Sequence, residues 1–337
     1  MGQRKGRYSL EDVARLAGVG IASVDRVLNE RGGVSAKTEQ RILDAARELG
    51  LRRILPAPHM RHLIIEVILA RSTSSFMVRL GAAAGQVAAT LDRSITVLRT
   101  NIDMTDPARV AARIKNSRAD GIIVYCEEHP QNIAAMKAAS EAGRQVICIV
   151  TDVPDAPRVA YVGIDHEKAG RTAAYFVARM GRRSGSALVL STSTGFRAHK
   201  QRIEGFNAAL CHYAPTLSVL PVLTTHDDPE KAYHHVKRTL QDRSDLAAVY
   251  NTGGGNEGVG HALRGAALEQ PTLFVGHELT DESAVLLKGG IMTMTIDQAP
   301  ELQARRAIDI MVSRLGAGTR QAISGEIAFT LHTVENF

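Results

Sequence analysis

The chain has 337 residues, of which 45% are hydrophobic and 23% are charged, a balance typical of globular proteins rather than disordered or fibrous chains. It contains no apolar run near the ~20 residues that a membrane helix needs, and its basic N-terminus lacks the apolar core of a signal peptide. We therefore expect a cytoplasmic protein with no membrane partner. The three cysteines, Cys126, Cys148 and Cys211, are odd in number and widely spaced, which predicts reduced thiols.

Positive charge is concentrated at the start of the chain. Residues 1–61 contain 12 Lys and Arg against 7 Asp and Glu, whereas the whole chain contains 41 and 35. The rest of the chain is therefore close to neutral. A solvated basic tail is one interpretation, but the helical periodicity of this segment argues against it. A basic folded module on a neutral body instead predicts a polyanionic partner for the module alone.

Three short helices are predicted within the first fifty residues. Their apolar residues recur at helical spacing, and Ser9 with Asp12 three positions later has the pattern of a capping box. Gly18 ends the first helix, and the turn that follows contains a second glycine. The predicted ranges are 10–17, 21–28 and 35–49.

Two helices joined by a glycine-containing turn and braced by a third form a helix-turn-helix unit. In this unit the second helix enters the major groove of DNA while the first crosses the backbone. The outer face of the second helix carries Ile21, Ala22 and Arg26, and arginine reads guanine through its O6 and N7 atoms. Ser23 and Asn29 lie where they can reach phosphates.

The same stretch resembles the DNA-binding head of the lac repressor (LacI/GalR) family of bacterial regulators. The similarity lies in LEDVARLAGVGIASVDRVLN at residues 10–29 and VSAKTEQRILDAARELG at residues 34–50. By this resemblance Ile21, Ala22 and Arg26 are the base readers, while Ser23 and Asn29 contact the DNA backbone. The resemblance also implies a double-stranded operator as partner.

Two departures from the family pattern concern DNA contacts. Gly20 and Asp25 stand where the family has serines, and Asp25 can pair with a neighbouring arginine or accept a hydrogen bond from cytosine. The segment LRRILPAPHMRHL at residues 51–63 lacks the usual hinge sequence, and Pro56 and Pro58 disfavour a helix there. Leu55 is a candidate minor-groove wedge, and a plain linker is the alternative.

The remainder of the chain, residues 62–337, alternates strand-like and helical segments. Apolar runs such as LIIEVIL, GIIVYC and AAVYNT are separated by helical stretches such as PARVAARIKNS. Repeated β-then-α order predicts parallel sheets covered by helices. Two doubly wound parallel α/β lobes are more plausible than one very large sheet, and a ligand would bind where strand ends face a crevice.

This body is similar to the type I periplasmic binding protein core of the same family, in which two lobes surround a sugar cleft. The resemblance places the helix-turn-helix domain at 1–54 and a linker at 55–61. Lobe one is expected at about 62–162 and 293–320, and lobe two at about 163–292 and 321–337. The resemblance further implies a carbohydrate or related small polar effector. We expect the protein to use no cofactor.

Candidate ligand contacts lie after predicted strands. A sugar requires polar groups for its hydroxyls and an apolar surface for its ring. By family pattern Phe76 stacks on the ligand, Ser74 replaces an asparagine, Arg202 forks two ligand oxygens, and Glu278 replaces an aspartate. Each residue by itself fits a structural role equally well; their recurrence at strand ends favours the site. The predicted set is Ser74, Phe76, Asp152, Arg202, Asn251, Glu278, Asp297 and Gln298.

A competing motif is GxGxxG, formed by Gly253, Gly255 and Gly258 after a strand and before a helix. This is the context of a dinucleotide fingerprint, so an NAD-sensing regulator or a dehydrogenase-like domain is the alternative function. The motif lies deep in the chain, and acids at the required distance fit only roughly. Glycines beside Asn251 also suit close approach of the backbone to any ligand.

Metal-dependent and other enzymatic sites are not indicated. His234 and His235 are adjacent and diverge on a helix, and the patterns GxSxG, HExxH and the Walker A lysine are missing. His199 and His277 are placed at the edge of the cleft. We therefore predict no enzyme and no metal, but a ligand-responsive repressor. A homodimer is expected to read a pseudo-palindromic operator, since a two-fold dimer presents two recognition helices.

Overall fold

The structure is a computed structural model that describes residues 9–29, 31–49, 62–72, 74–182, 184–266, 271–317 and 324–337. The chain divides near residue 62 into a small N-terminal unit and a larger unit. Each is described by itself. The predicted linker, Leu55 included, lies outside the described residues. None of the described helices is long and apolar enough to cross a membrane.

The small unit consists of three helices: α1 (Leu10–Ala17), α2 (Ile21–Leu28) and α3 (Ala36–Glu48). The predicted capping box forms, since the Ser9 hydroxyl accepts a hydrogen bond from the Asp12 backbone and the Asp12 carboxylate accepts one from the Ser9 N–H. Gly18 ends α1 in the left-handed conformation, at φ 63°. Val13, Val24 and Ile42 meet in a core that excludes water, which confirms the predicted helix-turn-helix.

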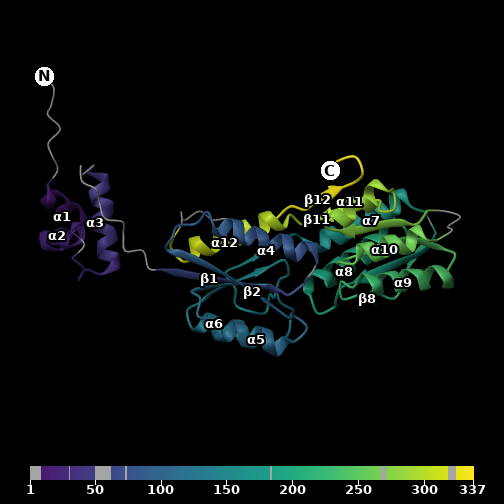
Figure 1. The fold of residues 1–337 in the computed structure, drawn as a ribbon, viewed down its shortest axis with the longest axis horizontal. Coiled ribbons are helices and arrows are strands. Elements are labelled where there is room, and N and C mark those ends of the chain that lie inside the picture. Colours follow the sequence, from purple (N-terminus) through teal and green to yellow (C-terminus); the bar gives the residue numbers. More distant parts are fainter. Residues whose placement is uncertain are drawn as a thin grey trace, which may run out of the picture. The chain divides into compact units, whose positions relative to one another are not determined.

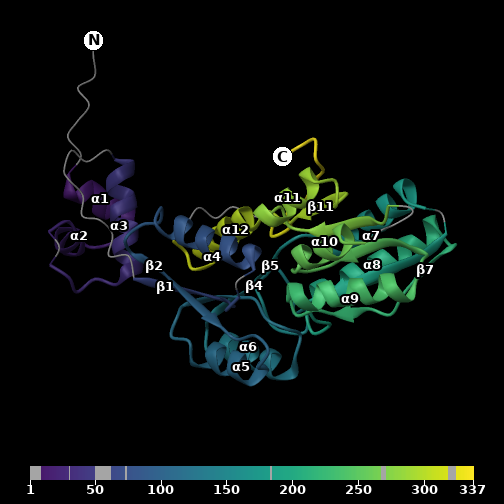
Figure 2. The same ribbon diagram turned by 45° about the vertical axis from the view of Figure 1, so that its right-hand side comes forward.

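Lobe one is a five-stranded parallel sheet in the order β2-β1-β3-β4-β5. In Figures 1 and 2 helices α4 and α12 cover one face of this sheet, and α5 and α6 cover the other. Its elements are β1 (Leu63–Ala70), α4 (Ser75–Ala88), β2 (Ile95–Ile102), α5 (Pro107–Asn116), β3 (Gly121–Val124), α6 (Pro130–Glu141), β4 (Gln145–Ile149), β5 (Ala160–Val162) and α12 (Pro300–Arg314).

Lobe two is a second sheet in the order β12-β11-β10-β9-β6-β7, with β8 paired to β6. Only β12 runs antiparallel to its neighbour among these pairs. The elements are α7 (His166–Met180), β6 (Gly185–Ser191), α8 (Arg197–Tyr213), β7 (Leu217–Val219), β8 (Leu223–Thr224), α9 (Pro229–Asp242), β9 (Leu246–Asn251), α10 (Asn256–Arg264), β10 (Leu273–His277), α11 (Asp281–Lys288), β11 (Met294–Asp297) and β12 (Thr330–His332).

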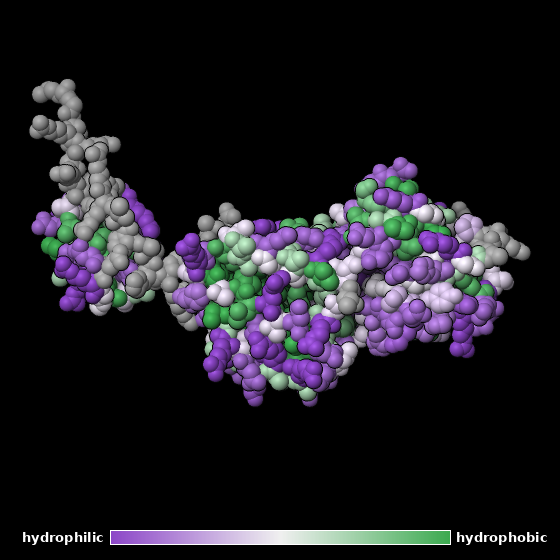
Figure 3. Space-filling model, in the orientation of Figure 1, coloured by the Kyte–Doolittle hydropathy of each residue, from purple (hydrophilic) through white to green (hydrophobic). Residues whose placement is uncertain are grey.

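Alternation along the strands of lobe two explains why helices cover both faces. In β6, Ala187 and Val189 belong to the core cluster that contains α7 and α8, whereas Leu188 and Leu190 belong to the cluster of α9, α10 and α11. Successive side chains of a strand point to opposite faces, so a strand that is apolar at every position requires helices on both sides. The outer surface around α9 is hydrophilic in Figure 3.

The chain crosses from lobe one to lobe two after β5, returns to lobe one after β11, and enters lobe two again between α12 and β12. The predicted return to lobe one near residue 293 is wrong, because β11 pairs with β10 and β12 in the second sheet. The return occurs instead at Gln298–Ala299, just before α12 packs on lobe one. Residues 294–297 stay in lobe two because β11 is buried at every position and pairs with strands of the second sheet.

Candidate functional site

The recognition helix α2 presents three of its predicted DNA-contact residues to solvent. Ile21 is 47% exposed, and Ala22 and Arg26 are also exposed, while Ser23 is half-buried. Arg26 lies beside the loop that follows the helix, where its Nη1 would be 3.2 Å from a Cβ at Gly33. A side chain at Gly33 would therefore restrict Arg26.

Asn29 is engaged within the head rather than turned outward. Its amide nitrogen donates to the Asp25 backbone carbonyl at 2.9 Å and to the Asp25 carboxylate at 2.6 Å. Arg31 donates to the same carboxylate at 2.9 Å. The structure thus places Asp25 in an arginine pair, one of its two predicted roles. Both amide hydrogens of Asn29 are used, so the predicted phosphate contact requires this arrangement to open.

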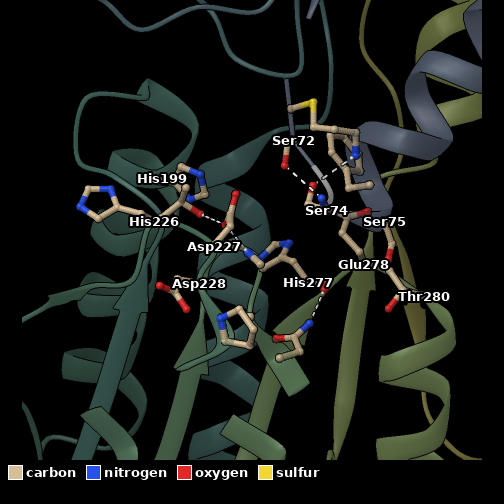
Figure 4. Close-up of a pocket in the computed structure, with 18 of the residues that line it drawn as sticks. Ser72, Ser74, Ser75, His199, His226, Asp227, Asp228, His277, Glu278 and Thr280 are labelled. Carbon is tan, nitrogen blue, oxygen red and sulfur yellow. Dashed lines mark hydrogen bonds between the residues drawn. The ribbon is translucent and has the colours of Figure 1, made fainter. Parts of the chain in front are cut away.

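In the larger unit a cavity of about 650 Å³ lies between the two lobes. Figure 4 shows side chains from both lobes turned toward this space: Ser74 and Ser75 at the start of α4, Asp227 and Glu278 in loops of lobe two, and His277 at the end of β10. These loops follow the carboxyl ends of β1, β8 and β10, which is where ligands bind in open parallel sheets.

Five of the eight predicted ligand residues line the cavity: Ser74, Phe76, Arg202, Glu278 and Gln298. Ser74 also caps α4, because its hydroxyl accepts from the Met77 N–H at 3.4 Å. Phe76 is 8% exposed and adds an aromatic side chain to the lining of the cavity.

The other three do not line the cavity, and each has a structural role instead. The Asp152 carboxylate accepts from Arg158 at 2.7 Å. The Asn251 amide donates to the Gly254 carbonyl at 2.9 Å and so shapes the loop before α10. Asp297 accepts from Arg79 and from the Leu279 N–H, both at 2.9 Å. A position at the end of a strand predicted that these three residues would face the ligand. It did not reveal their structural partners, which lie elsewhere in the same loop or in another segment of the chain.

Arg202 of α8 lines the cavity. It is only 2% exposed, and it donates from Nε to His166 Nδ1 at 3.1 Å and from Nη1 to the Thr252 carbonyl at 2.5 Å. His166 Nε2 lies 2.6 Å from the Val150 carbonyl, which only accepts. The imidazole therefore carries its proton on Nε2 and is neutral. Burial, followed by the charge of Arg202, holds the pKa of His166 well below its ordinary value.

Glu278 also lines the cavity, in a left-handed backbone conformation at φ 71°. Its Oε1 accepts from Gln298, while Oε2 is buried and has no partner among the described residues. Burial, with a smaller contribution from Asp297, raises the pKa of Glu278 to about 8. The side chain is therefore mostly protonated at neutral pH and can donate a hydrogen bond from Oε2.

The prediction missed several cavity residues, including Tyr125, Thr192 and Asp227, and it placed His199 and His277 only at the edge. His199 lies one turn before Arg202 on α8, and His277 directly precedes Glu278, so their spacing offered a signal. Asp227 follows the very short β8, which interrupts the strand pattern. Tyr125 stacks on Phe196 of the other lobe, with centroids 4.6 Å apart, a contact that no local pattern encodes.

The glycine motif serves packing within lobe two. A Cβ at Gly253 would collide with the Thr192 hydroxyl, and one at Gly258 with the Pro229 carbonyl, while Gly255 has φ 83°. The Gly254 N–H donates to the Asp227 carboxylate at 2.6 Å. A dinucleotide fingerprint uses such N–H groups for a pyrophosphate, and here a carboxylate occupies the group and repels phosphate. This geometry disfavours the NAD alternative.

Comparisons with known proteins agree with this two-part organisation. Residues 9–53 match the model of bacterial regulatory proteins of the lacI family, and residues 65–319 match the periplasmic binding protein domain. The chain belongs to the lacI family of bacterial regulatory proteins. As a member of that family it is a DNA-binding transcriptional regulator, and the resemblance in the head sequence is confirmed.

Individual relatives cover most of the chain. The HTH-type transcriptional regulator DegA of Bacillus subtilis is 27% identical over 249 residues, which span 72% of each protein. The ribose import binding protein RbsB of Haemophilus influenzae is 27% identical over 242 residues, spanning 70% of this chain and 80% of RbsB. A solute binding protein of Burkholderia graminis, solved with D-arabinose, has a TM-score of 0.75 at 20% identity and covers 82% of this chain and 97% of its own, which shows the shared fold.

Proposed function

We propose that this lacI-family chain is a repressor whose operator binding is controlled by a sugar or related polyhydroxylated ligand in the cavity between the lobes. The observation that carries the proposal is the presence, in one chain, of an exposed recognition helix and a polar cavity closed by two lobes. The similarity to a ribose import binding protein supports a carbohydrate as the ligand class.

The ligand would act by joining the two lobes. Phe76 belongs to lobe one and Arg202 to lobe two, so a molecule that touches both stabilises their closed arrangement. Direct contacts already connect the lobes around the cavity: Ser75 donates to Glu282 at 3.2 Å, and the Ala198 N–H donates to Thr151 at 3.1 Å. A ligand that changes the orientation of the lobes would thereby change the affinity for the operator. Because binding at two coupled sites is reciprocal, operator binding would change the affinity for the ligand by the same factor.

We further propose that the repressor is a homodimer on a pseudo-palindromic operator. One α2 helix reads only a few base pairs, and a two-fold dimer doubles the readout at half-sites one helical turn or a multiple apart. Light scattering of the purified chain tests the assembly, and a monomer at micromolar concentration would contradict it. The spacing of the selected half-sites provides an independent check.

The experiment begins with selection of a specific duplex from a random library with the full-length protein. Fluorescence anisotropy then measures affinity for that duplex with neutral sugars, polyols and sugar acids. We expect at least one compound to change the affinity about 5- to 150-fold, the range of allosteric coupling. If no compound changes either DNA affinity or the melting temperature, the cavity is not the proposed effector site.

A further inference from the structure

We propose that the effector carries a carboxylate, as sugar acids do, and that Arg202 binds this group. This inference rests on the proposed function of the cavity and assigns the chemical class of its ligand. A neutral sugar would fit the proposed function equally well, so the two statements can be tested separately.

The first observation is that Arg202 is a buried cation without an ionic partner. Its two hydrogen-bond acceptors are a neutral imidazole, His166, and a backbone carbonyl, that of Thr252. Among the described residues no carboxylate lies within 4.0 Å of its guanidinium nitrogens. Buried charges are normally paired, because removal from water is expensive without compensation. An anionic ligand supplies that compensation.

The second observation is that the three acids predicted to contact the ligand have partners other than Arg202. Asp152 forms an ion pair with Arg158, and Asp297 forms one with Arg79 at 2.9 Å. Glu278 lines the cavity, but it bonds to Gln298 and is mostly protonated at neutral pH. Among the described residues, Arg202 therefore keeps a positive charge that no carboxylate pairs with directly.

The imidazoles around Arg202 do not compete for an anion. Burial, followed by the charge of Arg202, lowers the pKa values of His199 and His277 as it does that of His166. Neutral imidazoles offer hydrogen bonds without adding further charge. A carboxylate presents two oxygens in the plane that the guanidinium fork matches, which gives a short, charge-assisted pair.

Four other carboxylates line the cavity, and their placement indicates the rest of the ligand. Asp227 accepts from Thr192 and from Gly254, Asp228 caps α9, and Glu282 accepts from Ser75. Glu257 is exposed in the first turn of α10. Carboxylates that keep acceptor capacity bind hydroxyl groups. Arg202 and these carboxylates together suit a molecule with both a carboxylate and hydroxyls.

The test compares matched ligands on the full-length protein. Galacturonate is paired with galactose and with its methyl ester, glucuronate with glucose, and gluconate with glucitol. Thermal unfolding identifies binding, and calorimetry measures the dissociation constant. We expect at least one acid to bind at least about 10-fold more tightly than its neutral partners, the range expected for hydrogen bonds to charged groups. This comparison needs no variant and is insensitive to folding defects.

Variants then locate the carboxylate. Arg202→Gln should lose the preference for the acid, Arg202→Lys should retain part of it, and Arg179→Gln, which removes an exposed arginine on α7, should leave it unchanged. Equal or tighter binding of a neutral partner overturns the inference and leaves the proposed function standing. An acid preference that survives in Arg202→Gln also overturns it. Failure of every acid and neutral sugar to bind overturns both.

Discussion

The guanidinium of Arg202 donates to His166 Nδ1 across 3.1 Å, so a cation that lines the cavity is held by an imidazole that must stay neutral. The same imidazole lies 2.6 Å from the Val150 carbonyl of lobe one, while Arg202 belongs to α8 of lobe two. One histidine, at the start of α7, therefore connects the two lobes behind the ligand cavity. Protonation of Nδ1 would remove the acceptor and place two cations in contact.

The first prediction concerns acid stability. The pKa of folded His166 lies well below its unfolded value of 6.5, so the unfolded state takes up the proton first. The stabilising effect of neutral His166 is complete above pH 6.5 and declines by about 1.4 kcal/mol per pH unit below it. His166→Gln keeps a side-chain acceptor and should reduce this slope by about that amount in urea unfolding between pH 6.5 and 5.

His234→Gln is the matched control, because His234 is exposed on α9 and its side chain is 71% accessible. The slope for this variant should equal that of the wild type. Identical slopes for all three proteins would show that His166 is not the acid-sensitive group. Burial lowers the pKa of His199 to about 3, so this residue also contributes to the dependence of stability on pH. Its contribution is the same in the wild type and in both variants.

The second prediction concerns Glu278, for which the sign is opposite. Its folded pKa of about 8 lies above the unfolded value of 4.5, so the folded state holds the proton longer. Rising pH therefore destabilises the fold by about 1.4 kcal/mol per unit between pH 4.5 and 8. Glu278→Gln should remove this slope and gain stability relative to the wild type as pH rises from 5.5 to 7.5. A constant difference across that range would contradict the raised pKa.

A third prediction uses two glycines of the head. Gly18 has φ 63°, and a Cβ there would lie 2.9 Å from Arg41 Nη2, whereas Gly20 has φ −73° and no heavy atom within 4 Å of its Cβ position. Gly18→Ala should destabilise the head by about 1–2 kcal/mol through left-handed strain. Gly20→Ala should cost less. Amide hydrogen exchange of α1 and α2 in the full chain measures the stability of the head in both variants. Equal protection in the two variants would contradict the predicted backbone strain at residue 18.

The fourth prediction tests the recognition helix. Arg26 is exposed on α2, and its replacement by Ala should weaken binding to the selected operator by about 1–3 kcal/mol while random DNA is affected much less. Arg47→Ala removes an exposed arginine from α3 and serves as the control. Anisotropy titrations at fixed salt provide the comparison. Equal weakening on specific and random duplexes would mean that Arg26 contacts phosphate instead of a base.

Local sequence determined the head almost completely. Ser9, Asp12 and Gly18 are signals for helix ends that act within a few residues, so the three helices follow from short-range physics. The alternation of apolar strands and amphipathic helices likewise determined two parallel α/β lobes, because strands that are apolar on both faces need helices on both sides.

The tertiary structure alone decided which polar residues reach the cavity. Asp152 and Asp297 have the right chemistry and position in the sequence, yet Arg158 and Arg79 take their carboxylates. Asp297 also belongs to the second sheet, so the boundary between the lobes lies after residue 297 and not near residue 293 as predicted. Which arginine pairs with a given carboxylate depends on contacts between residues that are distant in the chain. Neither a periodic pattern nor a sequence motif predicts such contacts.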